Sequence, residues 1–213
     1  FAAGGNLDID DYLVRAALNR WRLGQTVRAA IGRRSLRREL ADAGRELDRV
    51  SQTDALTGLA NTRVFEQRLD HAVEIALRRQ TNICLLMVDI NDFQAVNELV
   101  GRKHGDEVLR EVGERLTTIA RKSDTVARYG GDEFALVMET GSTVDGAKIV
   151  AERIIERLRA PIDVGGRKIT LDAKIGISIL GAHDGKMAVR QAGQALSAAK
   201  SKGQGYAIFA TGV

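Results

Sequence analysis

Two adjacent glycines at positions 130 and 131 constrain the fold of this chain more than any other feature of its sequence. They separate two short extended runs, residues 125–129 and 134–138. Glycine has no side chain and adopts positive φ values readily, as a tight turn between two strands requires. We therefore predict a β-hairpin, with Asp132 and Glu133 at or just after its tip.

Helical and extended patterns alternate through the rest of the chain from residue 54 onward. An unbroken apolar run at residues 83–88 ends in Asp89 and is typical of a buried strand. Pro161, the only proline, follows a helical stretch directly and is a stop signal for it. We expect helices at residues 62–79, 91–100, 106–121, 144–159 and 186–201, extended segments at 162–164, 168–179 and 206–209, and a turn at 165–166. This order predicts an α/β (α+β) sandwich, a mainly antiparallel sheet flanked by helices.

Three carboxylates are expected to meet at one rim of this sheet. Asp89 lies where a buried strand leaves the core, and Asp132 and Glu133 follow the hairpin turn. Clustered carboxylates repel one another, so a cation should join them. Because no His or Cys lies nearby, oxygen ligands favour Mg²⁺ or Mn²⁺, ions that usually bring a phosphate substrate. On these residues alone, a surface turn with two solvated acids is an equally good interpretation.

The positive charge of the chain is concentrated near its N-terminus. The 213 residues have a net charge of +4, but residues 15–49 hold ten arginines and four acids, so the remainder has a net charge of −2. Apolar residues recur here in steps of four and three, the spacing of a coiled-coil seam, at Leu36, Leu40, Ala43, Leu47 and Val50. We expect a linker helix that pairs with a second copy or packs on a neighbour; a solvated basic helix is the alternative. No aromatic or amide side chains that read bases accompany this seam, so we expect no nucleic-acid partner.

Two further properties of the sequence limit its class. No apolar run reaches the ~18 residues that span a bilayer, so we expect no membrane span in this fragment and a cytoplasmic location. Cys84 is the only cysteine, which excludes a disulfide framework or a cysteine metal cluster and fits a small buried residue in a reducing compartment. The chain begins at Phe1 and not at Met, so we expect it to be a piece of a longer protein.

The hairpin sequence RYGGDEF, residues 128–134, resembles the signature of the GGDEF domain, the diguanylate cyclase family. Three other motifs agree in order and spacing over about 160 residues. DALTGLANTRVF at 54–65 is similar to the opening motif of the family, VDINDFQAVNELVGRKHGDEVL at 88–109 to its metal-binding and guanine-binding stretch, and AGQALSAAKSKGQG at 192–205 to its closing helix.

This resemblance implies a palm-type, ferredoxin-like core and a homodimer in which each subunit holds one GTP. The 3′-hydroxyl of each GTP attacks the α-phosphate of the other, which yields cyclic di-GMP and pyrophosphate. The resemblance implies two Mg²⁺ (or Mn²⁺) ions per active site, held by Asp89, the Ile90 carbonyl, Asp132 and Glu133. Asp132 and Glu133 are then the catalytic residues, with Glu133 either a further ligand or the general base.

The resemblance also assigns residues to substrate and product. It implies that Asn97 and Asp106 bind the guanine edge and that Lys200 neutralises phosphate. Arg121 and Asp124 form an RxxD pair five residues before the signature, where the family binds cyclic di-GMP as an inhibitor. An arginine guanidinium group can donate two parallel hydrogen bonds to a phosphate or to a guanine edge. A helix-terminal arginine and a capping aspartate are the structural alternative.

Several positions depart from the family pattern, and two basic phosphate contacts are lost. Each such charged hydrogen bond contributes ~1.5–3 kcal/mol, and Arg102 or Lys103 are the residues that can compensate. The departures are Asn91, Gln94, Glu98, Arg102, Gly193, Ser197 and Gln204. Two functions are therefore open: a cyclase, favoured because the signature is intact, or a weak or inactive domain that acts as a receptor for GTP or cyclic di-GMP.

The first residues suggest a partner module upstream. Residues 5–15, GNLDIDDYLVR, resemble the last strand region of a receiver domain, although Arg15-Ala16 stands where Lys-Pro is usual. We expect three parts: the end of a sensory or receiver module at 1–31, a coiled-coil-like linker helix at 32–53 and the GGDEF domain at 54–213. A phosphodiesterase domain after Val213 is compatible with this arrangement.

Overall fold

A computed structural model of the chain describes residues 52–139, 143–180 and 184–209. The chain divides into two units, Phe1–Val50 and Ser51–Val213, and all the elements below belong to the second unit. The helices are α2 (Thr62–Arg79), α3 (Phe93–Val100), α4 (Arg102–Ile119), α5 (Val144–Arg159) and α6 (Gly185–Ser201). The strands are β1 (Ile83–Ile90), β2 (Thr125–Gly130), β3 (Glu133–Met138), β4 (Ile162–Val164), β5 (Arg167–Ile169), β6 (Ala173–Leu180) and β7 (Tyr206–Ile208).

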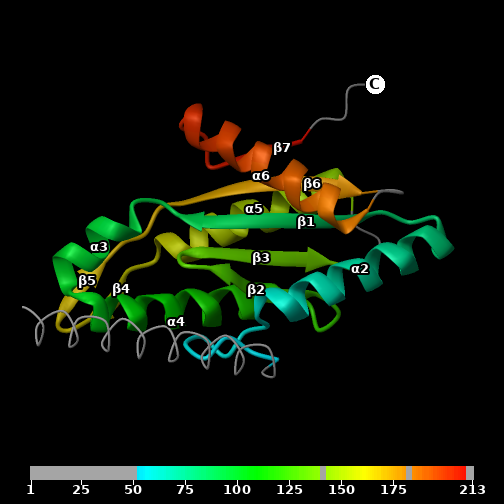
Figure 1. The fold of residues 1–213 in the computed structure, drawn as a ribbon. Coiled ribbons are helices and arrows are strands. Elements are labelled where there is room, and N and C mark those ends of the chain that lie inside the picture. Colours follow the sequence, from blue (N-terminus) through cyan, green and yellow to red (C-terminus); the bar gives the residue numbers. More distant parts are fainter. Residues whose placement is uncertain (1–51, 140–142, 181–183, 210–213) are drawn as a thin grey trace, which may run out of the picture. The chain divides into compact units, whose positions relative to one another are not determined.

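A five-stranded sheet in the order β2-β3-β1-β6-β7 forms the centre of the domain (Figure 1). β1 runs antiparallel to both of its neighbours, β2 and β3 form an antiparallel hairpin, and only β6 and β7 are parallel. β4 and β5 form a separate small hairpin. The predicted fold, a mainly antiparallel sheet flanked by helices, is therefore confirmed.

The central strand β1 explains why helices cover both faces of the sheet. All eight of its residues are buried. Ile83, Leu85 and Met87 pack in one core with α2 and α6, whereas Cys84 and Leu86 pack in the other with α4 and α5. Successive residues of a strand point to opposite faces, so an unbroken apolar run requires a helical layer on each side.

Local signals in the sequence fix the helix boundaries. α2 begins at the Asn61 cap, whose side chain accepts a hydrogen bond from the Val64 N–H at 3.0 Å. Gly101, with φ +81°, separates α3 from α4. The helices 62–79 and 144–159 are confirmed, and α3 starts two residues later than expected.

Two expectations were wrong in detail. α4 begins at Arg102, one turn before the predicted start at residue 106, because Gly101 directly precedes it and the chain needs no longer turn. The extended stretch 168–179 is broken into β5 and β6, which belong to different sheets. Strand pairing, which the local pattern does not encode, decides both the break and the partners.

The expected receiver-like segment 1–31 and most of the linker helix 32–53 lie outside the described residues. At the last residue of that linker, Thr53 forms an antiparallel bridge with Ala60 and not a helical turn. Ala60 in turn bridges to Ala127 of β2, so this segment is part of the folded domain. None of the helices in the described part of the chain is long and apolar enough to cross a bilayer.

Candidate functional site: an acidic rim beside a polar cleft

The β2–β3 hairpin carries the motif 128–134 in a fixed conformation. Gly131 has φ +54°, a value that side chains rarely adopt, as predicted for the turn. Gly130, which was expected to share this role, is the last residue of β2 and its φ is not positive. Arg128 holds the turn from within the motif, because its Nε and Nη2 donate to the Gly131 carbonyl at 2.9 and 2.7 Å.

Arg128 also ties the hairpin to the N-terminal turn of the domain. Its Nη1 lies 3.2 Å from Asp54 Oδ1, although the two residues are 74 positions apart. The Asp54 carboxylate accepts from both the N–H and the hydroxyl of Thr57, at 2.8 and 2.7 Å. Burial alone would raise the pKa of Asp54, but the Thr57 hydrogen bonds and the Arg128 charge outweigh it and lower that pKa.

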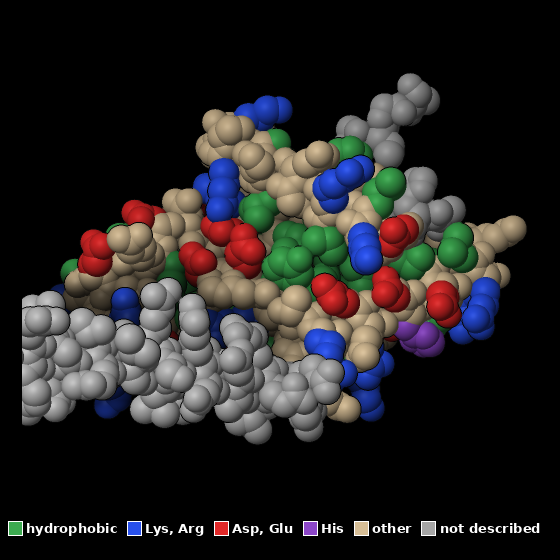
Figure 2. All heavy atoms as spheres, in the orientation of Figure 1, with side chains coloured by type: hydrophobic (Ala, Val, Ile, Leu, Met, Phe, Trp, Pro, Cys, Tyr) green, Lys and Arg blue, Asp and Glu red, His purple; other side chains and the backbone are tan. Residues whose placement is uncertain are grey.

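The three predicted carboxylates lie at the same end of the sheet. Asp89 and Glu133 are direct partners across β1 and β3, and the Ile90 N–H donates to the Asp132 carbonyl at 3.3 Å. Asp89 is 7% exposed, and its Oδ2 lies 2.7 Å from Lys200 Nζ on α6. Figure 2 shows acidic side chains gathered where the arrow of β1 ends in Figure 1, with basic side chains beside them.

Glu133 experiences the accumulated negative charge of this rim. Burial raises its pKa first, and the neighbouring Asp89 and Asp132 raise it further, while Lys200 opposes them. A carboxylate whose pKa is raised toward neutrality is suited to accept a proton during a reaction. The same repulsion favours the binding of a cation.

A polar cleft of about 960 Å³ opens between α3, α4 and the hairpin. Its wall includes Asn97 from α3, Arg102 and Asp106 from α4, and Asp132 from the hairpin. Gly105 leaves room for the Asn97 amide, because a Cβ at that position would lie 1.9 Å from Asn97 Oδ1. One hollow therefore contains two predicted guanine-binding residues and one predicted metal ligand.

Comparison with known proteins assigns the chain to a family. Residues 51–206 match the family model of the diguanylate cyclase GGDEF domain. The chain belongs to this family. It is 37% identical over 140 residues to the bifunctional diguanylate cyclase/cyclic di-GMP phosphodiesterase MucR of Pseudomonas aeruginosa, which covers 66% of the chain and 20% of MucR. It is 33% identical over 145 residues to the diguanylate cyclase TpbB of the same species, which covers 68% of the chain and 33% of TpbB. The chain thus spans a fifth to a third of the length of these curated relatives.

Solved GGDEF structures agree with the fold. The isolated GGDEF domain of TpbB superimposes with a TM-score of 0.71 at 31% identity, covering 74% of this chain and 94% of that structure. The GGDEF domain of DgcB from Caulobacter crescentus, solved in complex with cyclic di-GMP, gives a TM-score of 0.70 at 27% identity and covers 75% and 95% of the two chains.

The donor set at the rim of this GGDEF domain fits a hard divalent cation. Asp89, Asp132, Glu133 and the Ile90 carbonyl offer only oxygen, the ligand that Mg²⁺ and Mn²⁺ prefer. Within residues 52–139, 143–180 and 184–209, however, no three His, Cys, Asp or Glu side chains converge into a group that could hold an ion. The Asp89 carboxylate is instead paired with Lys200, which a bound cation would have to replace.

The predicted inhibitory pair follows α4. Asp124 Oδ2 accepts a hydrogen bond from the Arg121 backbone N–H at 2.9 Å, and the Asp124 N–H donates to the Arg121 carbonyl at 2.9 Å. This is the capping arrangement that the sequence left open as the structural alternative. Asp124 also lines a hollow of about 470 Å³ together with Arg68 and Lys122, whereas Arg121 is not among the residues of its wall.

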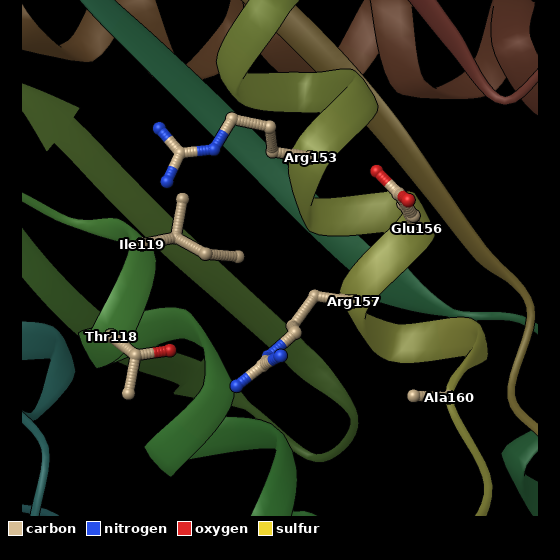
Figure 3. A pocket seen from close by; sticks show the side chains of 6 residues that line it. All are labelled: Thr118, Ile119, Arg153, Glu156, Arg157 and Ala160. Atoms are coloured by element: carbon tan, nitrogen blue, oxygen red, sulfur yellow. The ribbon is translucent and has the colours of Figure 1, made fainter.

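A further hollow, of about 480 Å³, lies between the end of α4 and α5. Figure 3 shows Arg153 and Arg157, one turn apart on α5, beside Thr118 and Ile119. Arg115 fixes the end of α5 near this hollow, since its guanidinium donates to the carbonyls of Arg157 and Pro161. These arginines carry no distinctive signal in the sequence, because i,i+4 basic residues are also usual on a solvated helix face.

The position of Lys174 at the acidic rim was also not predicted from the sequence. It is the direct partner of Asp89 on the β6 side, opposite the β3 side where Glu133 lies. A lysine in an extended stretch gives no signal of this position until the register between β1 and β6 is known. Lys200 was found through the resemblance, and the structure brings its amine to Asp89.

Proposed function

We propose that this GGDEF domain is a diguanylate cyclase that condenses two GTP molecules into cyclic di-GMP and pyrophosphate. The observation that carries the proposal is the shared cleft, where Asn97 and Asp106 lie in the same hollow as Asp132. Base recognition and phosphate chemistry on one nucleotide need such groups within the length of that nucleotide, and these residues come from separate elements but line one cleft. The family match supports the same activity.

Asn97 and Asp106 would select guanine. The Asp106 carboxylate accepts from the N1 and N2 donors of guanine, which adenine lacks, and the Asn97 amide both donates and accepts. Arg102 in the first turn of α4 lines the same cleft and supplies positive charge toward the nucleotide. Lys200 would neutralise phosphate at the rim, where its amine now faces Asp89.

Asp89, the Ile90 carbonyl, Asp132 and Glu133 would hold two Mg²⁺ (or Mn²⁺) ions. Such ions would neutralise the charge that develops on the attacking and leaving oxygens at the α-phosphorus during nucleotidyl transfer. Glu133 is either a further ligand or the general base; as the base it would accept the proton of the 3′-hydroxyl, a role that its raised pKa in the metal-free chain favours. The bond from O3′ to the α-phosphorus forms as the bond from that phosphorus to the β-phosphate oxygen breaks, and pyrophosphate leaves with the electron pair.

Each cleft binds one nucleotide, so the reaction requires two chains that face each other. Two such bonds, one from each subunit, close the ring of cyclic di-GMP. We further propose that Arg121 and Asp124 bind the product and limit its accumulation. Their side chains are near the surface, so a ligand can reach them without unfolding the domain.

A second function, a receptor without chemistry, is favoured by one specific contact. Gln94, which lines the cleft where the family has a phosphate-binding lysine, donates from Nε2 to Glu98 Oε1 at 2.9 Å. A neutral amide that is already engaged contributes less to phosphate binding than a free ammonium group. A domain of this kind would bind GTP or cyclic di-GMP and signal through its conformation.

Product analysis separates these two functions. The 213-residue chain is incubated with GTP and Mg²⁺ over a wide range of protein concentration, and the nucleotides are separated by chromatography. We expect cyclic di-GMP from the wild type and from Asp163→Ala, a control that removes an exposed acid on β4. Asp132→Ala should lower the rate by about 10³-fold.

Failure of the wild-type chain to form cyclic di-GMP at any concentration, with Asp132→Ala indistinguishable from it, would exclude the cyclase. Binding of cyclic di-GMP that persists in such a chain and is lost in Arg121→Ala would then support the receptor.

A further inference from the structure

A row of three charged residues crosses the sheet at the acidic rim. Glu133 on β3, Asp89 on β1 and Lys174 on β6 are direct partners in neighbouring antiparallel strands. Residues that lie directly opposite each other in antiparallel strands project to the same face of the sheet. The Lys174 side chain therefore projects from the same face of the sheet as the two carboxylates, on the strand next to that of Asp89.

The neighbours of Lys174 on β6 identify that face as the one beneath α6. The Ser178 hydroxyl donates to Gln191 of α6 at 2.9 Å, and a Cβ on Gly176 would lie 2.0 Å from the Ala192 carbonyl of the same helix. Residues 174, 176 and 178 share one face by the strand period of two. Since α6 also carries Lys200, the two lysines approach the rim from the strand and the helix that border it.

Lys174 is held close to the sheet. Its side chain is only 13% exposed, and its Nζ lies 2.8 Å from Asp172 Oδ2. Asp172 has a second cationic neighbour, Arg159, at 3.5 Å, and is itself 40% exposed. Asp172 therefore keeps a counter-ion and access to water if the lysine turns away from it. The Asp172 carbonyl also accepts from the Asn91 N–H at 2.8 Å, directly after the predicted ligand Ile90.

We propose that Lys174 is a further substrate-binding residue, which turns from Asp172 to the phosphates of the bound nucleotide. This inference rests on the proposed function and adds a residue to the same site. A triphosphate carries several negative charges, more than the single positive charges of Lys200 and Arg102 can neutralise. The two glutamines at 94 and 204 carry no charge, and Gln94 is bound to Glu98. Lys174 is the cation that the sheet register brings next to Asp89.

A binding experiment on the 213-residue chain tests this role without relying on turnover. The probe is a GTP analogue in which a methylene group replaces the oxygen between the α- and β-phosphates, so that pyrophosphate cannot leave. Titration calorimetry compares its affinity with that of guanosine, which has no phosphate. Lys174→Met should weaken binding of the analogue by about tenfold, the effect of one charged hydrogen bond, and leave guanosine binding unchanged.

Three variants separate a phosphate contact from a merely structural ion pair. Lys174→Arg keeps the charge and should retain binding within about threefold. Asp172→Asn removes the partner but leaves the ammonium group free, so it should not weaken binding of the analogue. Lys148→Met, the matched control, removes a lysine paired with an aspartate at 3.0 Å on α5 and should have no effect.

Three outcomes would overturn the inference. If Lys174→Met binds the analogue with an affinity within twofold of the wild type, Lys174 does not contact the phosphates. Equal losses in Lys174→Met and Asp172→Asn, shared by guanosine, would show that the ion pair only maintains the structure of the rim. If the wild-type chain binds neither the analogue nor guanosine, the proposed function fails first, and the role of Lys174 fails with it.

Discussion

Glu133 illustrates a conflict between stability and function within a single side chain. It lies in register with Asp89 and adjoins Asp132, so its charged form is disfavoured in the folded chain. The physical properties that prepare it to accept a proton therefore destabilise the fold whenever it is ionised. Replacement by an uncharged isostere should separate the two effects.

Glu133→Gln should raise the thermal stability of the chain at pH 7 while lowering cyclase activity by about 10²–10⁴-fold. The pKa of Glu133 is raised in the folded chain, so its cost to stability is fully present above that raised value. The cost disappears as the pH falls to the unfolded value, where both states are protonated. Thermal melts at several pH values in EDTA, without Mg²⁺, measure the difference.

The gain from Glu133→Gln should thus vanish near pH 4. An equal gain at all pH values would show that packing, and not charge, is responsible. Loss of stability at pH 7 would contradict the assignment of Glu133 as a repelled carboxylate.

At the scale of elements, the contact between α3 and α4 shapes the cleft. Asn97 on α3 lies against Gly105 on α4, where even one additional carbon does not fit. The position of the Asn97 amide, which we propose to bind the base, depends on this small residue, because the amide occupies the space that a Cβ would fill.

Gly105→Ala should displace Asn97 and weaken guanosine binding by about tenfold or more, because the new methyl group must overlap its amide oxygen. The matched control is Gly193→Ala on α6, where no atom lies within 4 Å of the added carbon. That variant should be stabilised by about 0.5–1 kcal/mol, since alanine favours a helix over glycine. Calorimetric titration with guanosine and urea denaturation measure the two effects; unchanged affinity in Gly105→Ala would contradict the close approach.

The clamp between Arg128 and Asp54 connects the hairpin to the start of the domain. Arg128→Met should lower the free energy of unfolding by about 1.5–3 kcal/mol, because it removes charged hydrogen bonds to Asp54 and Gly131. Arg78→Met is the control, since Arg78 forms an exposed i,i+4 pair with Glu74 and should change stability by less than about 0.5 kcal/mol. Urea denaturation compares both; equal effects would refute the clamp.

The pattern of the sequence predicted the elements better than their pairing. The unbroken apolar run of β1 indicated a buried strand, and Pro161 marked a helix boundary, because these signals are local. The contact of Arg128 with Asp54 and the position of Lys174 beside Asp89 depend on register between distant segments. Strand register follows from the packing of the whole sheet, so it could not be predicted from any short segment of the sequence.

At the scale of the whole molecule, the proposed reaction requires two clefts, because each chain would hold one GTP and one metal site. Each competent half-site should therefore form one phosphodiester bond. The order of the two bonds can be read from the products of a mixed dimer, whereas the wild-type chain alone should release only the cyclic product.

Mixing wild-type chains with an excess of Glu133→Gln should cause a linear dinucleotide to accumulate, since one half-site makes its bond and the other cannot close the ring. Wild-type chains alone should yield only cyclic di-GMP, at a rate that rises with the square of protein concentration when dimers are scarce. Chromatography of the nucleotides at a fixed amount of wild-type chain measures both species. A control mixture with excess Asp163→Ala, the exposed acid on β4, should give the cyclic product alone. A different result would mean that a single chain completes the reaction. In that case neither mixture would contain the linear species, and the rate of cyclic di-GMP formation per wild-type chain would not change with protein concentration.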